Sequence, residues 1–191
     1  MIHRQIIAIP LFIAATIADA QSNDAVVAHP IFATTYSCTE HSAGELQGLG
    51  DELGTDCFIE SLVEKNGRTW LRAYRTNGVK NQDWFGWSAD VLAPCSGTVK
   101  DVQENKITNK PGILGKPPAS MIQLNCASGV SFILAHIAAP TVTSGSSVEA
   151  GQRIAKVGNN GMSRQPHIHL GAWKDNVPLQ IRFDQTKIHH E

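Results

Sequence analysis

Short runs of alternating apolar and polar residues, separated by turn residues, dominate the chain from Cys57 onward. A period of two with many β-branched and aromatic side chains is typical of strands. Asn66-Gly67, Asn77-Gly78 and Asn159-Asn160-Gly161 favour tight turns between the runs. We therefore expect strands over residues 57–63, 68–74, 97–103, 120–126, 129–136, 153–157 and 166–173.

Helical signals are weak along the whole chain. No window combines an amphipathic period with capping residues at both ends. Residues 105–118 carry Asn109-Lys110-Pro111-Gly112 and Gly115-Lys116-Pro117-Pro118, which predict a surface loop. Residues 178–184 follow the last run and predict a further strand or a packed tail. The pattern as a whole predicts an all-β, antiparallel fold.

The first 55 residues differ from the rest of the chain in composition and in pattern. His3 and Arg4 precede an apolar stretch from Ile6 to Ile17, and the small-x-small triplet 18–20 follows, which is the layout of a secretory signal peptide cleaved near Ala20. Residues 21–55 are rich in Gly, Ser, Thr and acidic residues, so we expect a loosely ordered N-terminal segment. A domain over 56–185 and a tail over 186–191 complete the predicted organisation. The prediction is a secreted or periplasmic protein with no transmembrane segment in the mature chain.

Four cysteines suit two disulfides in an oxidising compartment. Three pairings are possible. We favour Cys38–Cys57, which closes a local loop, and Cys95–Cys126, which joins two neighbouring predicted strands. A structural zinc site is the competing interpretation, although the chain lacks the short C-x-x-C spacing of such sites.

Composition excludes one class of partner. Hydrophobic residues make up 42% and charged residues 17% of the 191 residues, which supports a sizeable core. The formal net charge is −1 and no basic run is present, so we do not expect nucleic acid as a partner.

The segment Pro166-His167-Ile168-His169-Leu170 carries the strongest chemical signal. On a strand, His167, His169, Gly171 and Trp173 share one face, and Ile168, Leu170 and Ala172 share the other. Two imidazoles about 7 Å apart along a strand can reach one small site. Imidazole is both a zinc ligand and a proton carrier near neutral pH. Two surface histidines on an exposed sheet face remain the alternative.

Turn-flanked hairpins precede this strand in a recognisable order. Val91-Leu92-Ala93-Pro94-Cys95-Ser96-Gly97 is one, and Val142-x-x-Gly145 followed by Val148-x-x-Gly151-Gln152 is another. Together with Val157-Gly158-Asn159-Asn160-Gly161-x-Ser163 and the P-H-x-H strand, they resemble the lysostaphin-like (LytM-type) zinc peptidases of metallopeptidase family 23. A lipoyl or biotinyl carrier, the other fold with such hairpins, would need a lysine where Cys95 and Ser96 stand.

The resemblance, which covers residues 79–173, implies a fold and a chemistry. The fold is an antiparallel sheet and sandwich-barrel hybrid, the duplicated hybrid motif. By resemblance His169 binds zinc, His167 assists catalysis, and His136 in Phe132-Ile133-Leu134-Ala135-His136 lines the same site. A buried structural role for His136 is the alternative.

The remaining ligands of the family come from an H-x-x-x-D motif, which this chain does not show intact upstream of Val91. Asp83 is the nearest counterpart of the aspartate, with Val79 where the histidine should be. A second register places Leu71 and Arg75 at these positions. Zn²⁺ is therefore expected with a missing first ligand, for which Asn81, His29, His41 and the tail pair His189-His190 are candidates.

Aromatic residues gather beside Asp83. Trp84 and Trp87 could bind sugar or peptide, or simply cover a sheet edge. The resemblance implies an exported zinc metalloendopeptidase acting on peptidoglycan cross-links or another peptide substrate. Alternatives are a degenerate relative that binds cell wall or regulates another hydrolase, and a purely structural exported β domain.

Overall fold

The computed structural model describes residues 24–187. The predicted signal peptide, residues 1–20, and His189-His190 lie outside the described residues. Strands account for almost all the regular structure, and the described helices are two single 3₁₀ turns, η1 (Asn81–Asp83) and η2 (Gln185–Lys187). The all-β prediction is confirmed.

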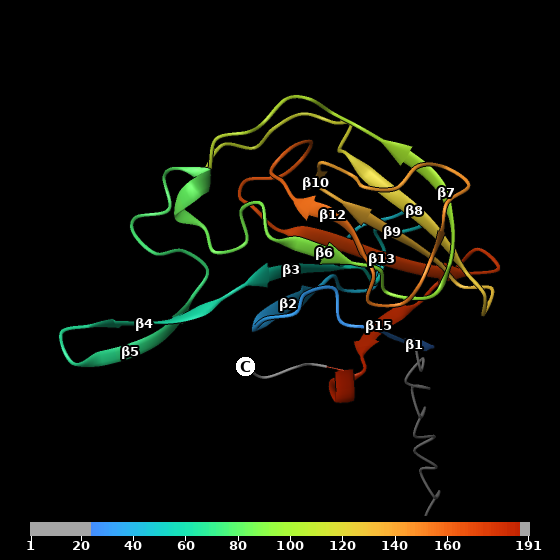
Figure 1. Ribbon diagram of the computed structural model, residues 1–191, viewed down its shortest axis with the longest axis horizontal. Helices are drawn as coiled ribbons and strands as arrows, with labels where there is room; N and C mark the ends of the chain where they lie inside the picture. Colours follow the sequence, from blue (N-terminus) through green and yellow to red (C-terminus); the bar gives the residue numbers. More distant parts are fainter. Residues whose placement is uncertain (1–23, 188–191) are drawn as a thin grey trace, which may run out of the picture.

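An eight-stranded antiparallel sheet forms the body of the molecule (Figure 1). Its strand order is β11-β7-β8-β9-β13-β3-β2, and β14 pairs with β13. The bounds are β2 (Tyr36–Glu40), β3 (Thr55–Ile59), β7 (Gly97–Gln103), β8 (Met121–Cys126), β9 (Ser131–Ala135), β11 (Ser147–Val148), β13 (Ile168–Lys174) and β14 (Val177–Pro178).

Three smaller sheets complete the described chain. One has the order β10-β12-β6, one is the hairpin β4-β5, and one pairs β1 with β15 in parallel. The bounds are β1 (Ala25–Ala28), β4 (Ser61–Lys65), β5 (Arg68–Arg72), β6 (Asp90–Leu92), β10 (Ile137–Ala138), β12 (Arg153–Val157) and β15 (Gln180–Phe183). The β4-β5 hairpin projects away from the body, whereas the β10-β12-β6 sheet lies beside the large sheet (Figure 1).

The core lies between the large sheet and the β10-β12-β6 sheet. Ile168, Leu170 and Ala172 are fully buried on one face of β13, as their alternation predicts. Buried residues of β8, β9 and β12 join the same cluster, among them Ile122, Leu124, Phe132, Leu134 and Ile154. β13 is therefore fixed by its apolar face, and its histidines point to the opposite side.

The N-terminal segment is more ordered than expected. Residues 24–55 contain β1 and β2, and β2 pairs with β3 at the edge of the large sheet. Only Tyr36 and Cys38 of β2 pack against the core, and pairing with β3 together with the disulfide holds the rest of this edge strand. The segment thereby lies against β13 and covers its histidine-bearing face.

Both favoured disulfides are present. Cys38 and Cys57 are directly opposite one another on β2 and β3. Cys95 is joined to Cys126, which closes the start of β7 against the end of β8. Each cysteine is thus used in the described structure, in the pairing that the sequence favours over a zinc site.

Among residues 24–187, no helix is long and apolar enough to cross a membrane.

Candidate metal centre

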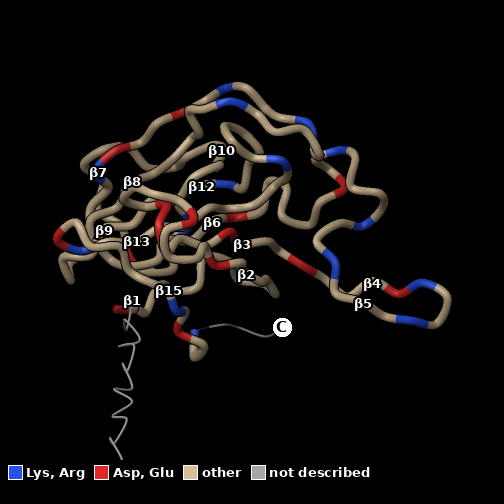
Figure 2. Tube along the Cα trace, turned by 180° about the vertical axis from the view of Figure 1, so that it is seen from behind, with Lys and Arg blue, Asp and Glu red and all other residues tan. Residues whose placement is uncertain are grey.

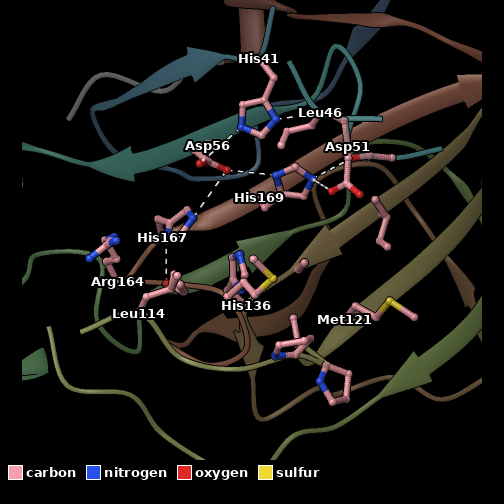
Figure 3. A pocket seen from close by; sticks show the side chains of 18 of the residues that line it. His41, Leu46, Asp51, Asp56, Leu114, Met121, His136, Arg164, His167 and His169 are labelled. Atoms are coloured by element: carbon pink, nitrogen blue, oxygen red, sulfur yellow. Dashed lines mark hydrogen bonds and ion pairs between the residues drawn. The ribbon is translucent and has the colours of Figure 1, made fainter. Parts of the chain in front are cut away.

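Three histidines predicted to share a site do so. His167 and His169 come from the start of β13, and His136 follows β9, the neighbouring strand. The ring centroids of His136 and His167 are 4.7 Å apart, and those of His136 and His169 are 6.3 Å apart. All three are at least 92% buried, so they are not surface histidines on an open sheet. They line one cavity of about 690 Å³ (Figure 3).

Two residues at the strands β2 and β3 complete this cluster. Asp56 on β3 lies beside His169, because these residues are directly opposite in the antiparallel register. His41 follows β2, and its backbone N–H donates to the carbonyl of Gly54 on the neighbouring chain segment. One ligand atom from each of His41, Asp56 and His169 fits within 4.8 Å of the other two.

The donor atoms suit a zinc ion. His169 Nδ1 lies 3.0 Å from Asp56 Oδ1, and His41 Nε2 lies 3.5 Å from Asp56 Oδ2. Tetrahedral zinc with bonds near 2.0–2.1 Å requires donors roughly 3.4 Å apart, so these separations are of the right size. Two imidazoles and one carboxylate are also the ligand types that zinc accepts.

Backbone carbonyls orient both imidazoles. The Nδ1–H of His41 donates to the carbonyl of Asp51 over 3.1 Å, which leaves Nε2 as the lone-pair atom facing Asp56. The Nε2–H of His169 donates to the carbonyl of Gly50 over 2.8 Å, which turns Nδ1 toward Asp56. Metal-binding histidines are commonly held in this way by a second acceptor. Both carbonyls come from one loop, residues 48–54.

Burial and hydrogen bonding shift two of the ligand pKa values in opposite directions. Burial disfavours the Asp56 carboxylate, but hydrogen bonds and charge from His167 and His169 outweigh it and lower the pKa of Asp56. Burial also disfavours the charged form of His169, but the hydrogen bond to Asp56 outweighs it and raises the pKa of His169. In both groups the contact between His169 and Asp56 thus favours the charged form, in opposition to burial.

Backbone carbonyls hold the Nδ1 atoms of both His136 and His167, and both rings line the cavity. The Nδ1–H of His136 donates to the Asn160 carbonyl over 2.8 Å, and burial followed by the nearby His167 lowers the pKa of His136 to about 3. His167 Nδ1 lies 2.8 Å from the carbonyl of Gln165, so its Nε2 faces Asp56 at 3.6 Å. His136 thus carries its lone pair on Nε2.

Backbone strain accompanies the placement of His136. Its φ of 63° lies in the left-handed region, which non-glycine residues rarely adopt. The side chain of Asn160 supports this turn by donating to the Ile137 carbonyl and accepting from the Ser120 N–H. Such a strained conformation persists where the surrounding contacts hold it in place, and it is common at functional sites.

The structure does not bring Asp83 to this cluster. Asp83 ends η1, where its Oδ2 accepts from the Lys80 N–H over 2.9 Å, and hydrogen bonds from Thr76 and Lys80 lower its pKa. It is not among the described residues that line the cavity. Asn81 bonds to Asn109 and Asn159, and His29 lies against Pro30, so neither replaces a ligand.

Trp84 and Trp87 also lie outside the described lining of the cavity. The Trp84 indole N–H donates to the Gly78 carbonyl, and its ring packs 5.1 Å from that of Tyr74. The apolar wall of the cavity is formed instead by Leu46, Leu49, Leu114, Met121 and Ile133.

Sequence reasoning missed Asp56 and the carbonyls of Gly50 and Asp51. One signal was available for Asp56. The stretch Glu52-Leu53-Gly54-Thr55-Asp56 has the H-x-x-x-D spacing, with glutamate in the first position. The sequence offered His41 as one of several candidates for the missing first ligand. The structure places this histidine beside Asp56.

Comparison with known proteins identifies the family. The sequence model of Peptidase family M23 matches residues 82–181, more than half of the chain. The chain belongs to peptidase family M23. The match begins after His41 and Asp56, so this M23 chain carries part of its candidate metal cluster in a segment that precedes the matched region.

Solved structures similar to this M23 chain include two catalytic domains and one pore-forming complex. The catalytic domain of lysostaphin from Staphylococcus simulans is 19% identical, with a TM-score of 0.45 over 75% of this chain and 86% of that one. The catalytic domain of the M23 protein EnpA from Enterococcus faecalis is 20% identical, with a TM-score of 0.47 over 77% and 87%. A SpoIIQ–SpoIIIAH complex is 21% identical, with a TM-score of 0.48 over 82% and 87%. A search of curated proteins gave no match.

Proposed function

We propose that this protein is an exported zinc metalloendopeptidase that cleaves peptide cross-links of peptidoglycan. The observation that carries the proposal is the cluster of His41, Asp56 and His169, whose donor atoms face one another beside two further buried histidines. M23 peptidases are zinc-dependent, and the donor set here fits that ion.

In this proposal His41 Nε2, one oxygen of Asp56 and His169 Nδ1 hold the ion. Zinc at these donors supplies Lewis acidity, which polarises a peptide carbonyl and brings the pKa of water near neutrality. A neutral His136, with its lone pair on Nε2, accepts a proton at that atom. His167 directs Nε2 into the same cavity, and when that nitrogen carries a proton it donates to the substrate oxygen on which negative charge develops.

The cavity suits an extended peptide with small or apolar side chains. Leu46, Leu49 and Leu114 line it together with Met121 and Ile133. Arg164 lies on the same wall as His167 and offers a cation for a substrate carboxylate (Figure 3). Peptides of the cell wall combine both features, small side chains and free carboxylates.

Metal binding is the first test. Protein secreted without its first 20 residues and purified without chelator is analysed for metal content and titrated with Zn²⁺ by calorimetry. We expect about one zinc per chain, and we expect His41→Ala, Asp56→Asn and His169→Ala each to lose it. His29→Ala is the matched control, because His29 lies against Pro30 and Gly151 away from the cluster. If His41→Ala binds zinc as the wild type does, His41 is not a zinc ligand.

Hydrolysis is the second test. Purified peptidoglycan is incubated with the zinc-loaded protein. The released peptides are separated by chromatography and identified by mass spectrometry. We expect release by the wild type and its loss in His169→Ala and His136→Ala, the latter with zinc still bound. Intact cross-links after incubation with the zinc-loaded wild type would contradict the proposed substrate.

A second candidate function is a degenerate relative that binds cell wall or regulates another hydrolase. Glu52 stands four residues before Asp56, where a family H-x-x-x-D motif has histidine, and both nitrogens of His169 are already hydrogen-bonded. This candidate predicts no zinc after incubation with excess metal but retained binding to peptidoglycan in a sedimentation assay.

A further inference from the structure

The β4-β5 hairpin stands apart from the metal centre. It connects directly to β3, and β4 and β5 pair only with each other among the described strands. A two-stranded hairpin has little stability by itself. Its base is secured by the β-bridge between Tyr74 and Trp84, and its tip extends into solvent (Figures 1 and 2).

The two faces of this hairpin differ in chemistry. The register pairs Val63 with Trp70 and Lys65 with Arg68, and Arg72 lies opposite Ser61 on the same face. That face presents three cations and one indole and no carboxylate. Glu64 belongs to the opposite face with Leu62, Thr69 and Leu71. The charges along the hairpin are visible in Figure 2.

A shallow hollow of about 440 Å³ lies on the cationic face. It is lined by Val63, Lys65, Trp70, Arg72 and Tyr74. The Arg72 guanidinium stacks 4.2 Å from the centroid of the Tyr74 ring and donates to the Thr76 carbonyl over 3.1 Å. Arg72 is therefore oriented before any ligand arrives, while Trp70 leaves 45% of its surface exposed.

We propose that this face, Val63, Lys65, Arg68, Trp70, Arg72 and Tyr74, binds an acidic saccharide, meaning a sugar that carries a carboxylate. Guanidinium and ammonium groups bind carboxylates through charge-assisted hydrogen bonds. An exposed aromatic ring covers the flat C–H face of a pyranose, which is apolar. Cations and rings side by side on one flat ribbon match a ligand that has both features in one unit.

An acidic peptide is the rival ligand, and the surface favours it less. A peptide side chain binds in an apolar recess, whereas Val63 is the sole aliphatic side chain that lines the hollow among the described residues. The hairpin shares no lining residue with the histidine cavity, so its role does not depend on the proposed peptidase activity.

The test uses the whole mature protein and defined probes. Hexagalacturonate, its methyl ester and neutral chitohexaose are titrated by calorimetry at low salt. We expect hexagalacturonate to bind more tightly than either uncharged sugar. Lys65→Gln/Arg68→Gln should weaken it about tenfold, which corresponds to about 1.4 kcal/mol. Trp70→Ala should weaken all sugars that bind.

Controls separate this site from general charge and from folding. Lys100→Gln/Lys174→Gln removes the same charge from other strands and should leave binding unchanged. Circular dichroism checks that each variant is folded, and Lys65→Gln/Arg68→Gln keeps Trp70 in place should Trp70→Ala disturb the hairpin. The proposal is overturned if hexagalacturonate does not bind, if the hairpin variants bind it as the wild type does, or if hexaglutamate binds as tightly.

Discussion

At the scale of single residues, the geometry of the candidate metal cluster depends on which nitrogen of each imidazole ring is hydrogen-bonded to the backbone. His41 and His169 each give one N–H to a backbone carbonyl, of Asp51 and of Gly50, and turn the other nitrogen to Asp56. A ring free to rotate would lose entropy on binding an ion. Fixing both rings beforehand removes that cost, and it assigns the donor atoms Nε2 and Nδ1.

Tyr36 is a residue whose polar group has no partner in the described structure. Its hydroxyl is buried without a hydrogen bond, and burial raises the pKa of Tyr36. Its ring packs edge-on against Phe32 and Phe183. We predict that Tyr36→Phe keeps these ring contacts and raises the free energy of unfolding by about 1 kcal/mol, because the desolvated hydroxyl is removed.

Chemical denaturation of the two proteins measures this difference. Tyr36→Ala is the comparison variant and should lose about 3 kcal/mol or more, because both ring contacts and a filled volume disappear. A lower stability for Tyr36→Phe would mean that the hydroxyl makes a stabilising contact.

At the scale of elements, the loop over residues 48–54 is the part that positions the ligands. Gly50 packs directly on β13, and a Cβ placed on Gly171 would lie 1.9 Å from the Gly50 carbonyl oxygen. This contact between two backbones is possible only because residue 171 is glycine. The close approach is what brings the Gly50 carbonyl to His169.

We predict that Gly171→Ala displaces this loop. The expected results are a loss of about 1–3 kcal/mol of stability from overpacking and a zinc affinity lower by about tenfold or more. Thermal unfolding and zinc calorimetry measure the two effects. Gly86→Ala is the control, since its nearest atoms would lie 3.8 Å from the new methyl group. Unchanged zinc affinity in Gly171→Ala would show that the Gly50 carbonyl does not orient His169.

The edge strand β2 explains how a distant histidine reaches Asp56. In the antiparallel register Cys38 lies opposite Cys57 and Glu40 opposite Thr55, which carries His41 to Gly54. The favoured disulfide Cys38–Cys57 already implied this juxtaposition, because residues just after Cys38 must then lie beside those just before Cys57. The favoured disulfide therefore indicated that His41 lies near Asp56, but only on the further condition that the two strands run antiparallel.

At the scale of the whole molecule, the two disulfides secure different parts. Cys38–Cys57 joins the strands that carry His41 and Asp56, whereas Cys95–Cys126 joins β7 and β8 away from them. We predict that Cys38→Ser/Cys57→Ser and Cys95→Ser/Cys126→Ser each lose about 2–4 kcal/mol of stability. Only the first should also lose zinc affinity, because β2 is an edge strand that pairs with β3 alone among the described strands.

Zinc titration below the unfolding temperature of both variants tests this. Equal zinc affinity in the two variants would show that the backbone pairing of β2 suffices to hold His41.

The chain between β3 and β6 accounts for the difference between the expected aspartate and Asp56. Asp83 was favoured because it lies eight residues before Val91, where the resemblance implies about nine. The β4-β5 hairpin and η1 occupy the chain between β3 and β6, so Asp56 stands much farther back. Spacing along the sequence fails as a guide here, because the pairing of β3 with β2 and β13 places Asp56 in the cluster whatever the length of the chain that follows β3.

The sequence by itself determined the all-β class and most strands from β7 to β13. It favoured both disulfides, and the family resemblance implied the shared site of His136, His167 and His169. The class and the strands follow from local alternation and turn residues, which depend on neighbours along the chain. Only the tertiary structure decided that His41 and Asp56 join His169 and that Asp83 does not. Such contacts arise from strand order and register, and these depend on which surfaces pack together rather than on any local pattern.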